Sequence, residues 1–260
     1  MHSKNRAILR EMVVTDFKVR YQNSVLGYLW SLLKPLLLFT ILYVVFTYII
    51  PLGKDVEHYP VYLLTGIVFW NFFTESTMLG ASSVVARGDL IRKISIPRYL
   101  VVISSSLSAL INLLLSLIVV FIFALLNGIA PSISWLLIIP IIIEMYAFLL
   151  GVSFLLSTLY VKFRDITYIW EIVLQAGFYA SAIIFPLTFV PIEYRKWFFI
   201  NPIVQIVQDA RYIIATDTSI TIWSTIHSWA VLVPFVIIVI IAFVGGWYFK
   251  SRSKYFAEDI

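Results

Sequence analysis

Long apolar runs recur along the chain and are separated by shorter polar stretches. Each run is long enough for a helix of about 20 residues, the length needed to cross a bilayer core of about 30 Å. Lys34 and Pro35 lie inside the first run, so we expect its crossing to begin at Leu36, with Lys34 reaching back to the interface. The pattern predicts an all-α integral membrane protein that forms one transmembrane domain over residues 1–260. The six predicted transmembrane helices are Tyr28–Ile50, Val61–Val85, Tyr99–Leu126, Trp135–Tyr160, Ile169–Val190 and Trp229–Phe249.

The N-terminal segment, residues 1–27, mixes charged and apolar residues. Ile8, Met12 and Val19 fall on one face of a helix drawn through it. This pattern predicts an amphipathic helix that lies in the cytoplasmic interface of the membrane. A helical tail surrounded by solvent is the alternative, and the pattern alone leaves it open.

The segment before the last span, residues 191–228, is too long for an ordinary connection and carries several aromatic side chains. Connections longer than about 15 residues usually have structure or function of their own. Because Pro191 and Pro202 interrupt the segment, we predict short helices that re-enter the outer leaflet. Such backbone is tolerated at membrane depth only against protein or a water-filled cavity.

The composition excludes a soluble protein. Hydrophobic residues make up 61% of the 260 residues and charged residues only 13%, whereas about 25% of a soluble domain is charged. Fifteen of the 19 Lys and Arg residues lie in the two termini and in the loops after the second and fourth spans. An excess of basic residues marks the cytoplasmic side, so both termini, including the tail 250–260 after the last span 229–249, are predicted to be cytoplasmic.

The remaining composition argues against several kinds of site. The net charge of +5 resides beside apolar spans, where lipid headgroups and topology explain it, so no nucleic-acid partner is expected. The chain has no cysteine and only three scattered histidines, which leaves no disulfide and little for a metal site. A phosphate-binding loop is also missing. We therefore expect no cofactor on this chain, and any energy for transport must come from a gradient or a separate subunit.

Three carboxylates lie within or at the edge of predicted spans, namely Glu75, Glu144 and Glu171. A carboxylate in lipid is costly, so each is expected to face protein or water. They form either the proton relay of a secondary transporter or polar groups that position helices or line a conduit, and the sequence leaves both open. A membrane enzyme would need a cluster of reactive polar residues at one interface, and none is found in the sequence.

Aromatic residues make up 17% of the chain and some lie deep in the predicted spans. Phe39, Tyr43 and Phe46 have the spacing of a single helical face in the first span. Phe178 and Tyr179 lie in the fifth span. Packing inside the bundle is the commoner role for such rings, and a lining that stacks on sugars is the alternative.

Several stretches resemble the permeases of polysaccharide ABC exporters, which belong to the type-2 ABC permease family. They are Asp16–Tyr21, Ser24–Trp30, Leu33–Pro35, Ile91–Arg98, Tyr160–Ile166 and parts of the outer segment from Phe185 to Tyr212. This family exports O-antigen, capsule and wall teichoic acid chains on lipid carriers. The resemblance covers nearly the whole chain.

The resemblance implies a permease subunit that moves a lipid-linked polysaccharide, O-antigen-like, across the cytoplasmic (inner) membrane. It implies six spans, an N-terminal interfacial helix and short re-entrant helices before the last span. The permease is expected to be a homodimer that works with two copies of a separate ATPase, where ATP and magnesium bind. The conduit is expected between the two permeases. Teichoic acid or capsule export is the alternative within the family, followed by a drug or lipid exporter and, outside it, a proton-coupled secondary transporter.

The resemblance also implies a coupling role for the loop Arg87–Arg98, which the pattern alone explains as an ordinary basic loop. In this family the loop carries a helix that docks on the ATPase. The expected polar contacts with the ATPase are Asp89, Arg92 and Lys93.

A gate and a conduit complete the expected site. Gly27, Tyr28 and Trp30 lie where the interfacial helix turns into the first span, and we expect them to form the cytoplasmic gate, with a simple hinge as the alternative. The expected conduit lining is Phe39, Tyr43, Phe46, Phe178 and Tyr179.

Overall fold

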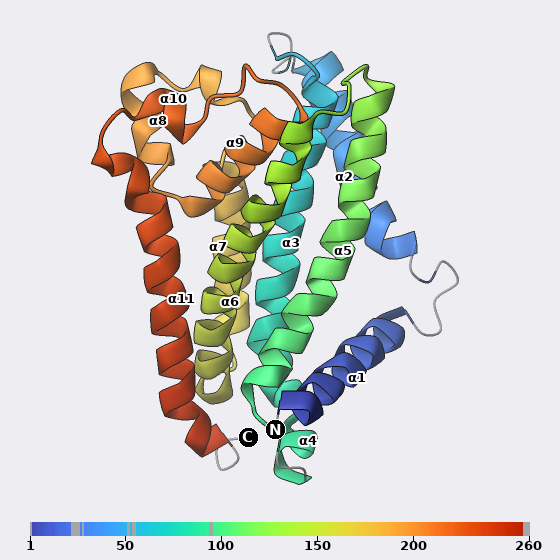
Figure 1. The fold of residues 1–260 in the computed structure, drawn as a ribbon, viewed down its shortest axis with the longest axis vertical. Helices are drawn as coiled ribbons and strands as arrows, with labels where there is room; N and C mark the ends of the chain where they lie inside the picture. The colour runs from blue at the N-terminus through green and yellow to red at the C-terminus, as the bar shows by residue number, and fades with distance from the viewer. Residues whose placement is uncertain are drawn as a thin grey trace.

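The computed structural model describes residues 2–21, 27, 29–50, 53, 56–93 and 96–256. All regular secondary structure within these ranges is helical, as predicted. The long helices run up and down a common axis (Figure 1). Because they alternate in direction, the start of the first helix and the end of the last lie at the same end of the bundle, which is also the end that carries the short helix α4 (Gly88–Lys93).

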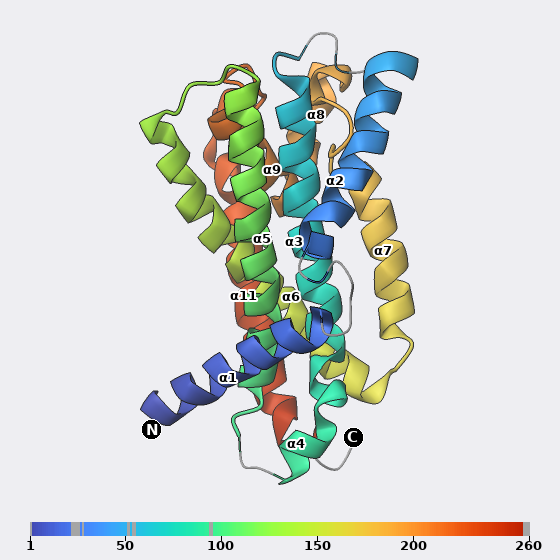
Figure 2. The same cartoon turned by 90° about the vertical axis from the view of Figure 1, so that its right-hand side faces the viewer.

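Six helices form the bundle. They are α2 (Leu29–Val44), which continues into the π-helix η1 (Val45–Ile49), α3 (Tyr59–Ala86), α5 (Tyr99–Leu126), α6 (Ile138–Lys162), α7 (Ile166–Ala180) and α11 (Val233–Arg252). Short 3-10 helices, η2 (Ile133–Leu137) and η4 (Trp229–Leu232), lead into α6 and α11, and η5 (Ser253–Tyr255) follows α11. Figure 2 shows α3 at the centre of this bundle, with α2 and α7 on one side and α5 on the other.

Within the described part of the chain, four segments are long and apolar enough to cross a membrane, namely Leu32–Ile49, Tyr99–Leu126, Ile133–Lys162 and Trp229–Tyr255. They coincide with four of the six predicted spans. The second predicted span is the 28-residue helix α3, which carries Asn71 and Glu75 among its apolar residues. Neighbouring helices pack around α3, so its polar groups need not face lipid.

The fifth predicted span, Ile169–Val190, is wrong in its second half. Helix α7 has only 15 residues and ends at Ala180. Ala182 takes a left-handed φ of 51°, which a helix does not allow. The following residues form a buried turn up to Pro186, and a short 3-10 helix, η3 (Leu187–Phe189), comes next.

The N-terminal segment forms α1 (His2–Tyr21), which crosses the lower end of α5 (Figure 2). Met12 is buried there, and Ile8 packs against the same apolar cluster. Val19, which was predicted on the same face, is 62% exposed. The apolar face therefore stays in contact with the bundle along only part of the helix.

The predicted short helices before the last span are present as α8 (Ile192–Phe198), α9 (Pro202–Ile214) and α10 (Ile222–Thr225). Asn201 caps α9, because its side chain accepts a hydrogen bond from the Ile203 amide at 3.0 Å. Helix α9 is largely buried and packs against α3 and α6, whereas α8 and α10 lie at the top of the bundle (Figure 1).

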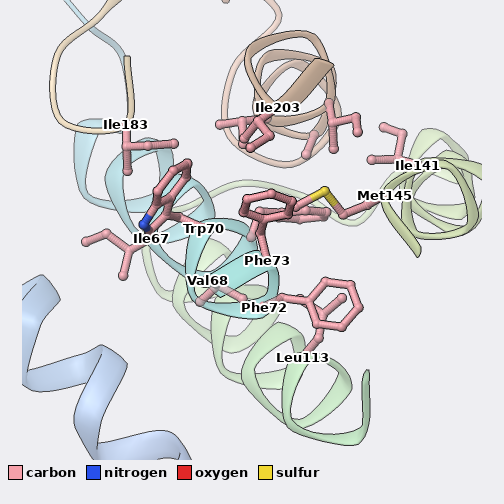
Figure 3. Packing of buried hydrophobic residues seen from close by; sticks show 14 of the residues in the cluster. Ile67, Val68, Trp70, Phe72, Phe73, Leu113, Ile141, Met145, Ile183 and Ile203 are labelled. Atoms are coloured by element: carbon pink, nitrogen blue, oxygen red, sulfur yellow. The ribbon is translucent and has the colours of Figure 1, made fainter. Parts of the chain in front are cut away.

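The main core lies between α3, α5, α6 and α9 (Figure 3). Phe73 of α3 stacks on Phe148 of α6 with ring centroids 5.5 Å apart. Ile203 of α9 joins the same cluster beside Met145 and Ile141. The core thus includes side chains of α9 together with those of the long helices.

Candidate functional site

A cavity of about 450 Å³ lies between α2, α3 and α5, near the start of α2. Its lining combines apolar side chains with Lys34, Glu75 and Asn112. Asn112 donates a hydrogen bond from Nδ2 to Glu75 Oε1 at 2.7 Å, which joins α5 to α3. Each of the three helices therefore contributes both polar and apolar side chains to the lining.

Two of the three expected gate residues can be placed beside this cavity. Trp30 lines it and is 46% exposed. Gly27 has a left-handed φ of 48°, and its carbonyl accepts a hydrogen bond from the Trp30 amide at 3.3 Å. The chain therefore bends at Gly27, where a side chain would be strained. Tyr28 lies outside the described residues.

The aromatic stripe of α2 is packed mainly inside the subunit. Phe39 is only 6% exposed, stacks on Tyr43 at 5.7 Å and meets Phe123 of α5 edge-on at 5.5 Å. Tyr43 and Phe46 are half-buried against the same core. These contacts give Phe39 a packing role and leave parts of the other two rings accessible.

The two expected lining rings on α7 contact α3 and each other. Phe178 packs on Trp70 of α3 with ring centroids 5.9 Å apart. Tyr179 meets Phe178 edge-on at 5.6 Å and is 61% exposed. Tyr179 is thus the more accessible of the two rings.

The three expected coupling residues lie on α4, at the end of the bundle where α1 starts (Figure 1). Arg92 contacts Asp89 at 3.5 Å, one turn apart, and both side chains are largely exposed. Lys93 is exposed as well. Ile91 is buried in the apolar cluster below α5. One face of α4 is therefore packed against the bundle, and the opposite face exposes the charged side chains.

Arg87, counted in the sequence as one of several loop cations, joins three helices. It pairs with Asp16 of α1 and donates a hydrogen bond to Ser104 Oγ of α5 at 2.7 Å. Burial lowers the pKa of the Arg87 guanidinium, and Asp16 supplies the opposite charge. The N-terminal helix is thereby fastened to the ends of α3 and α5.

Arg211 is fully buried on α9. Its guanidinium donates hydrogen bonds to the carbonyls of Tyr62 at 3.0 Å, Ala182 at 2.9 Å and Ile183 at 2.6 Å. It also lies 3.7 Å from the centroid of the Tyr62 ring. A Cβ on Gly66 would come within 2.4 Å of Arg211 Nη2. The guanidinium therefore occupies space that any side chain at position 66 would fill. Arg211 ties α9 to α3 and to the turn that ends α7.

A second buried polar group on α9 faces α6. Gln205 donates from Nε2 to Asp209 Oδ2 at 2.7 Å and to Glu144 Oε2 of α6 at 3.5 Å. Glu75 and Glu144 therefore both hydrogen-bond between helices, as the helix-positioning interpretation expects. Glu171, the third carboxylate noted in the sequence, is exposed on α7.

The sequence signal for these buried groups is weak. Asp16 and Arg211 lie within the stretches that resemble polysaccharide exporters, and Arg87 lies shortly before one of them, but their spacing does not show that they are buried. Gln205 and Asp209 occupy one face of a predicted outer helix. Their contacts depend on how far α9 enters the bundle, which only the folded structure shows.

Comparison with known proteins identifies the family. The family model described as "ABC-2 type transporter" matches residues 9–215. The chain is 31% identical over 204 residues to the O-antigen export system permease protein RfbA of Klebsiella pneumoniae, with 78% of each chain covered. It is 26% identical to the RfbA protein of Myxococcus xanthus over 261 residues, which cover 98% of this chain and 96% of the relative.

A more distant relative is the polysialic acid transport protein KpsM of Escherichia coli, which is 22% identical over 214 residues, 79% of this chain and 80% of the relative. The family match covers most of the chain, from α1 to the end of α9, and includes every buried polar contact described above. The chain belongs to the ABC-2 type transporter family.

Proposed function

We propose that this chain is the transmembrane permease subunit of an ABC exporter that moves a lipid-linked polysaccharide of the O-antigen type across the cytoplasmic membrane. The observation that carries this proposal is the 31% identity to an O-antigen export permease over 78% of both chains. The all-helical fold with four membrane-length apolar segments supports it. The hydrolysis of ATP is assigned to a separate subunit, which would bind ATP and magnesium.

The proposal includes six membrane crossings, made by α2, α3, α5, α6, α7 and α11. Their alternating directions support this count, because an even number of crossings returns the end of α11 to the side where α1 starts (Figure 1). That side carries the basic residues of α1, α4 and the end of α11, so we assign it to the cytoplasm. Helix α1 then lies in the inner interface, and α9 enters from the outer face.

Two copies of the chain and two copies of the ATPase are proposed to form the exporter, with the conduit between the two permeases. The exposed side chains of α4 support its assignment as the docking helix for the ATPase, with Asp89, Arg92 and Lys93 as contacts. The bend at Gly27 and the cavity beside Trp30 support a cytoplasmic gate there.

The lining of the conduit is proposed to include the accessible aromatic rings of Tyr43, Phe46 and Tyr179. Rings stack on the C–H faces of sugars in shallow contacts, which allows a polymer to slide. Phe39 and Phe178 are proposed to support this lining from behind, because their rings pack on α5 and α3.

Export of a capsular polysaccharide is the second candidate, because polysialic acid transport proteins also match the chain. Their 22% identity is lower than the 31% and 32% of the O-antigen permeases, so O-antigen-type cargo is favoured.

The test uses cells that lack their own O-antigen export permease and receive this chain together with its ATPase. We expect O-antigen to appear on the cell surface, detected by antibody binding to intact cells. The matched control carries an ATPase variant that binds but cannot hydrolyse ATP, and it should leave the polymer inside. Surface polymer that does not depend on ATP hydrolysis would contradict the proposal.

A further inference from the structure

A second cavity, of about 730 Å³, lies between the lower ends of α5 and α11, beside the loop that follows α4. Its volume falls within the range of about 300–1,000 Å³ that is typical of small-molecule sites. The inner wall is apolar and is formed by Ile91, Ile96, Phe154 and Phe249. These side chains belong to the apolar cluster that closes the bundle below α5. An occupant would thus contact α4, α6 and α11 together.

The lining also carries two cationic side chains. Arg98 and Lys250 both line the cavity, and among the described residues that line it there is no carboxylate. The Arg98 guanidinium donates a hydrogen bond to the Ser253 carbonyl. This bond holds the Arg98 side chain between the start of α5 and the end of α11. Lys250 is exposed. The charge of the lining therefore matches an anionic group placed above an apolar wall.

We infer that this cavity binds an anionic phospholipid, with the phosphate between Arg98 and Lys250 and an acyl chain on the apolar wall. The cavity lies where two membrane-length helices, α5 and α11, begin and end, which is the depth of the headgroups. Basic pockets between transmembrane helices on the cytoplasmic side bind such headgroups. A water-soluble protein partner would not supply an acyl chain for the apolar wall, so a lipid fits this lining better. The inference does not depend on the identity of the exported polymer.

The bound lipid would have a structural consequence. Ile91 lies on α4 and Phe249 lies near the end of α11, and both line the cavity. A lipid between them fills the space that separates α4 from the last span. Anionic lipid is therefore expected to steady the position of α4.

The binding test uses the full chain purified in a neutral detergent and native mass spectrometry. The probes are phosphatidylglycerol, phosphatidylcholine with the same acyl chains, and glycerol 3-phosphate. We expect phosphatidylglycerol to bind with a Kd about tenfold or more below that of phosphatidylcholine. Glycerol 3-phosphate should bind weakly, because it lacks the acyl chains. Equal binding of the two lipids, or tight binding of glycerol 3-phosphate, would overturn the inference.

Two variants test the site, one by removing a charge and the other by filling the cavity. Lys250→Gln removes one charge from an exposed side chain. Gly246→Phe fills the cavity, because Gly246 lines it and a Cβ there meets nothing within 4 Å. Each should raise the Kd for phosphatidylglycerol about tenfold. The matched control, Val244→Phe, adds a ring to the same helix at a position that is 42% exposed and outside the cavity lining. It should leave the Kd unchanged.

Two other occupants are distinguished in the same assay. Displacement of phosphatidylglycerol from the wild-type chain by the ATPase subunit would make the cavity part of a protein contact and overturn the inference. Displacement by an equal concentration of lipid-linked polysaccharide would assign the cavity to the substrate, with the same consequence. If Lys250→Gln and Gly246→Phe both bind like wild type, the lipid lies elsewhere.

Discussion

At the scale of single residues, the buried cations explain how the two ends of the bundle are held. Arg211 is surrounded by three carbonyl groups and a tyrosine ring, with no exposed surface. Its planar guanidinium has several donors in a fixed geometry, which one ammonium group cannot reproduce. Arg211 therefore supplies three hydrogen bonds to the polar attachment of α9 to α3 and to the turn after α7. Gln208, which accepts from Tyr62, and Asn201, which donates to Ser181, add one bond each.

Replacement of Arg211 tests this attachment. Arg211→Gln leaves carbonyls of Tyr62, Ala182 and Ile183 without their donors, so we expect the free energy of unfolding to fall by roughly 3 kcal/mol. Arg211→Lys should recover only part of the loss, because it cannot reach all three carbonyls. Thermal unfolding of the purified chain measures the effect. Arg252→Gln, at an exposed position, serves as the control and should unfold like wild type. An unchanged unfolding midpoint for Arg211→Gln would contradict the assigned role.

At the scale of helices, the ion pair between Asp16 and Arg87 fixes α1 to the bundle. Both side chains are about one-fifth exposed, at 21% and 20%. The pair on α4, Asp89 with Arg92, is far more exposed, at 86% and 50%. Because solvent screens exposed pairs, the two should differ in how much they contribute to stability.

A double-mutant cycle measures this difference. We expect Asp16→Asn and Arg87→Gln to show a coupling energy of about 1 kcal/mol or more in the free energy of unfolding. The matched cycle, Asp89→Asn with Arg92→Gln, should give about 0.5 kcal/mol or less. Equal coupling in both pairs would show that the contact between α1 and Arg87 does not hold the helix.

Helix α4 is expected to act in coupling rather than in stability. Charge reversal at Asp89, Arg92 and Lys93 should separate ATP hydrolysis from export while the permease still inserts, because these side chains face outward. Both activities are measured with the ATPase present. Lys162→Glu, at another exposed position on the same end of the bundle, is the control. Wild-type hydrolysis and export in all three variants would show that α4 does not dock on the ATPase.

The helices were predictable to very different degrees. The span Tyr99–Leu126 was predicted with the bounds of α5, because its long apolar run has clear polar ends. The predicted fifth span was too long, because the apolar residues after Ala180 pack in a buried turn instead of a helix. The burial of Arg211 could not be predicted, since a cation in the outer segment, which also carries Arg195 and Lys196, resembles an exposed residue. Its carbonyl partners come from α3 and from the turn after α7, far away in the sequence.

At the scale of the whole molecule, the proposed path of the polymer can be tested at the accessible aromatic rings. Because the chain has no native cysteine, single cysteines report on their own surroundings. Cysteines at Tyr43, Phe46 and Tyr179 should react with water-soluble reagents during turnover, since these positions are proposed to line a hydrated conduit. A cysteine at Ile118 of α5, which is 55% exposed and apolar, is expected to face lipid and react only with lipid-soluble reagents. Equal behaviour at all four positions would place the conduit elsewhere.

The account of the whole molecule depends on one activity, the ATP-driven export of a lipid-linked polysaccharide by this chain and its ATPase. Its most direct measurement uses vesicles that contain both proteins, with the ATP-binding side outward and lipid-linked O-antigen in the outer leaflet. We predict that ATP moves the polymer into the vesicle lumen, where it becomes protected from an added glycosidase. Vesicles with the ATPase alone, or with ATP that cannot be hydrolysed, should show no protection. Polymer that remains fully digestible in vesicles that hydrolyse ATP would contradict the account.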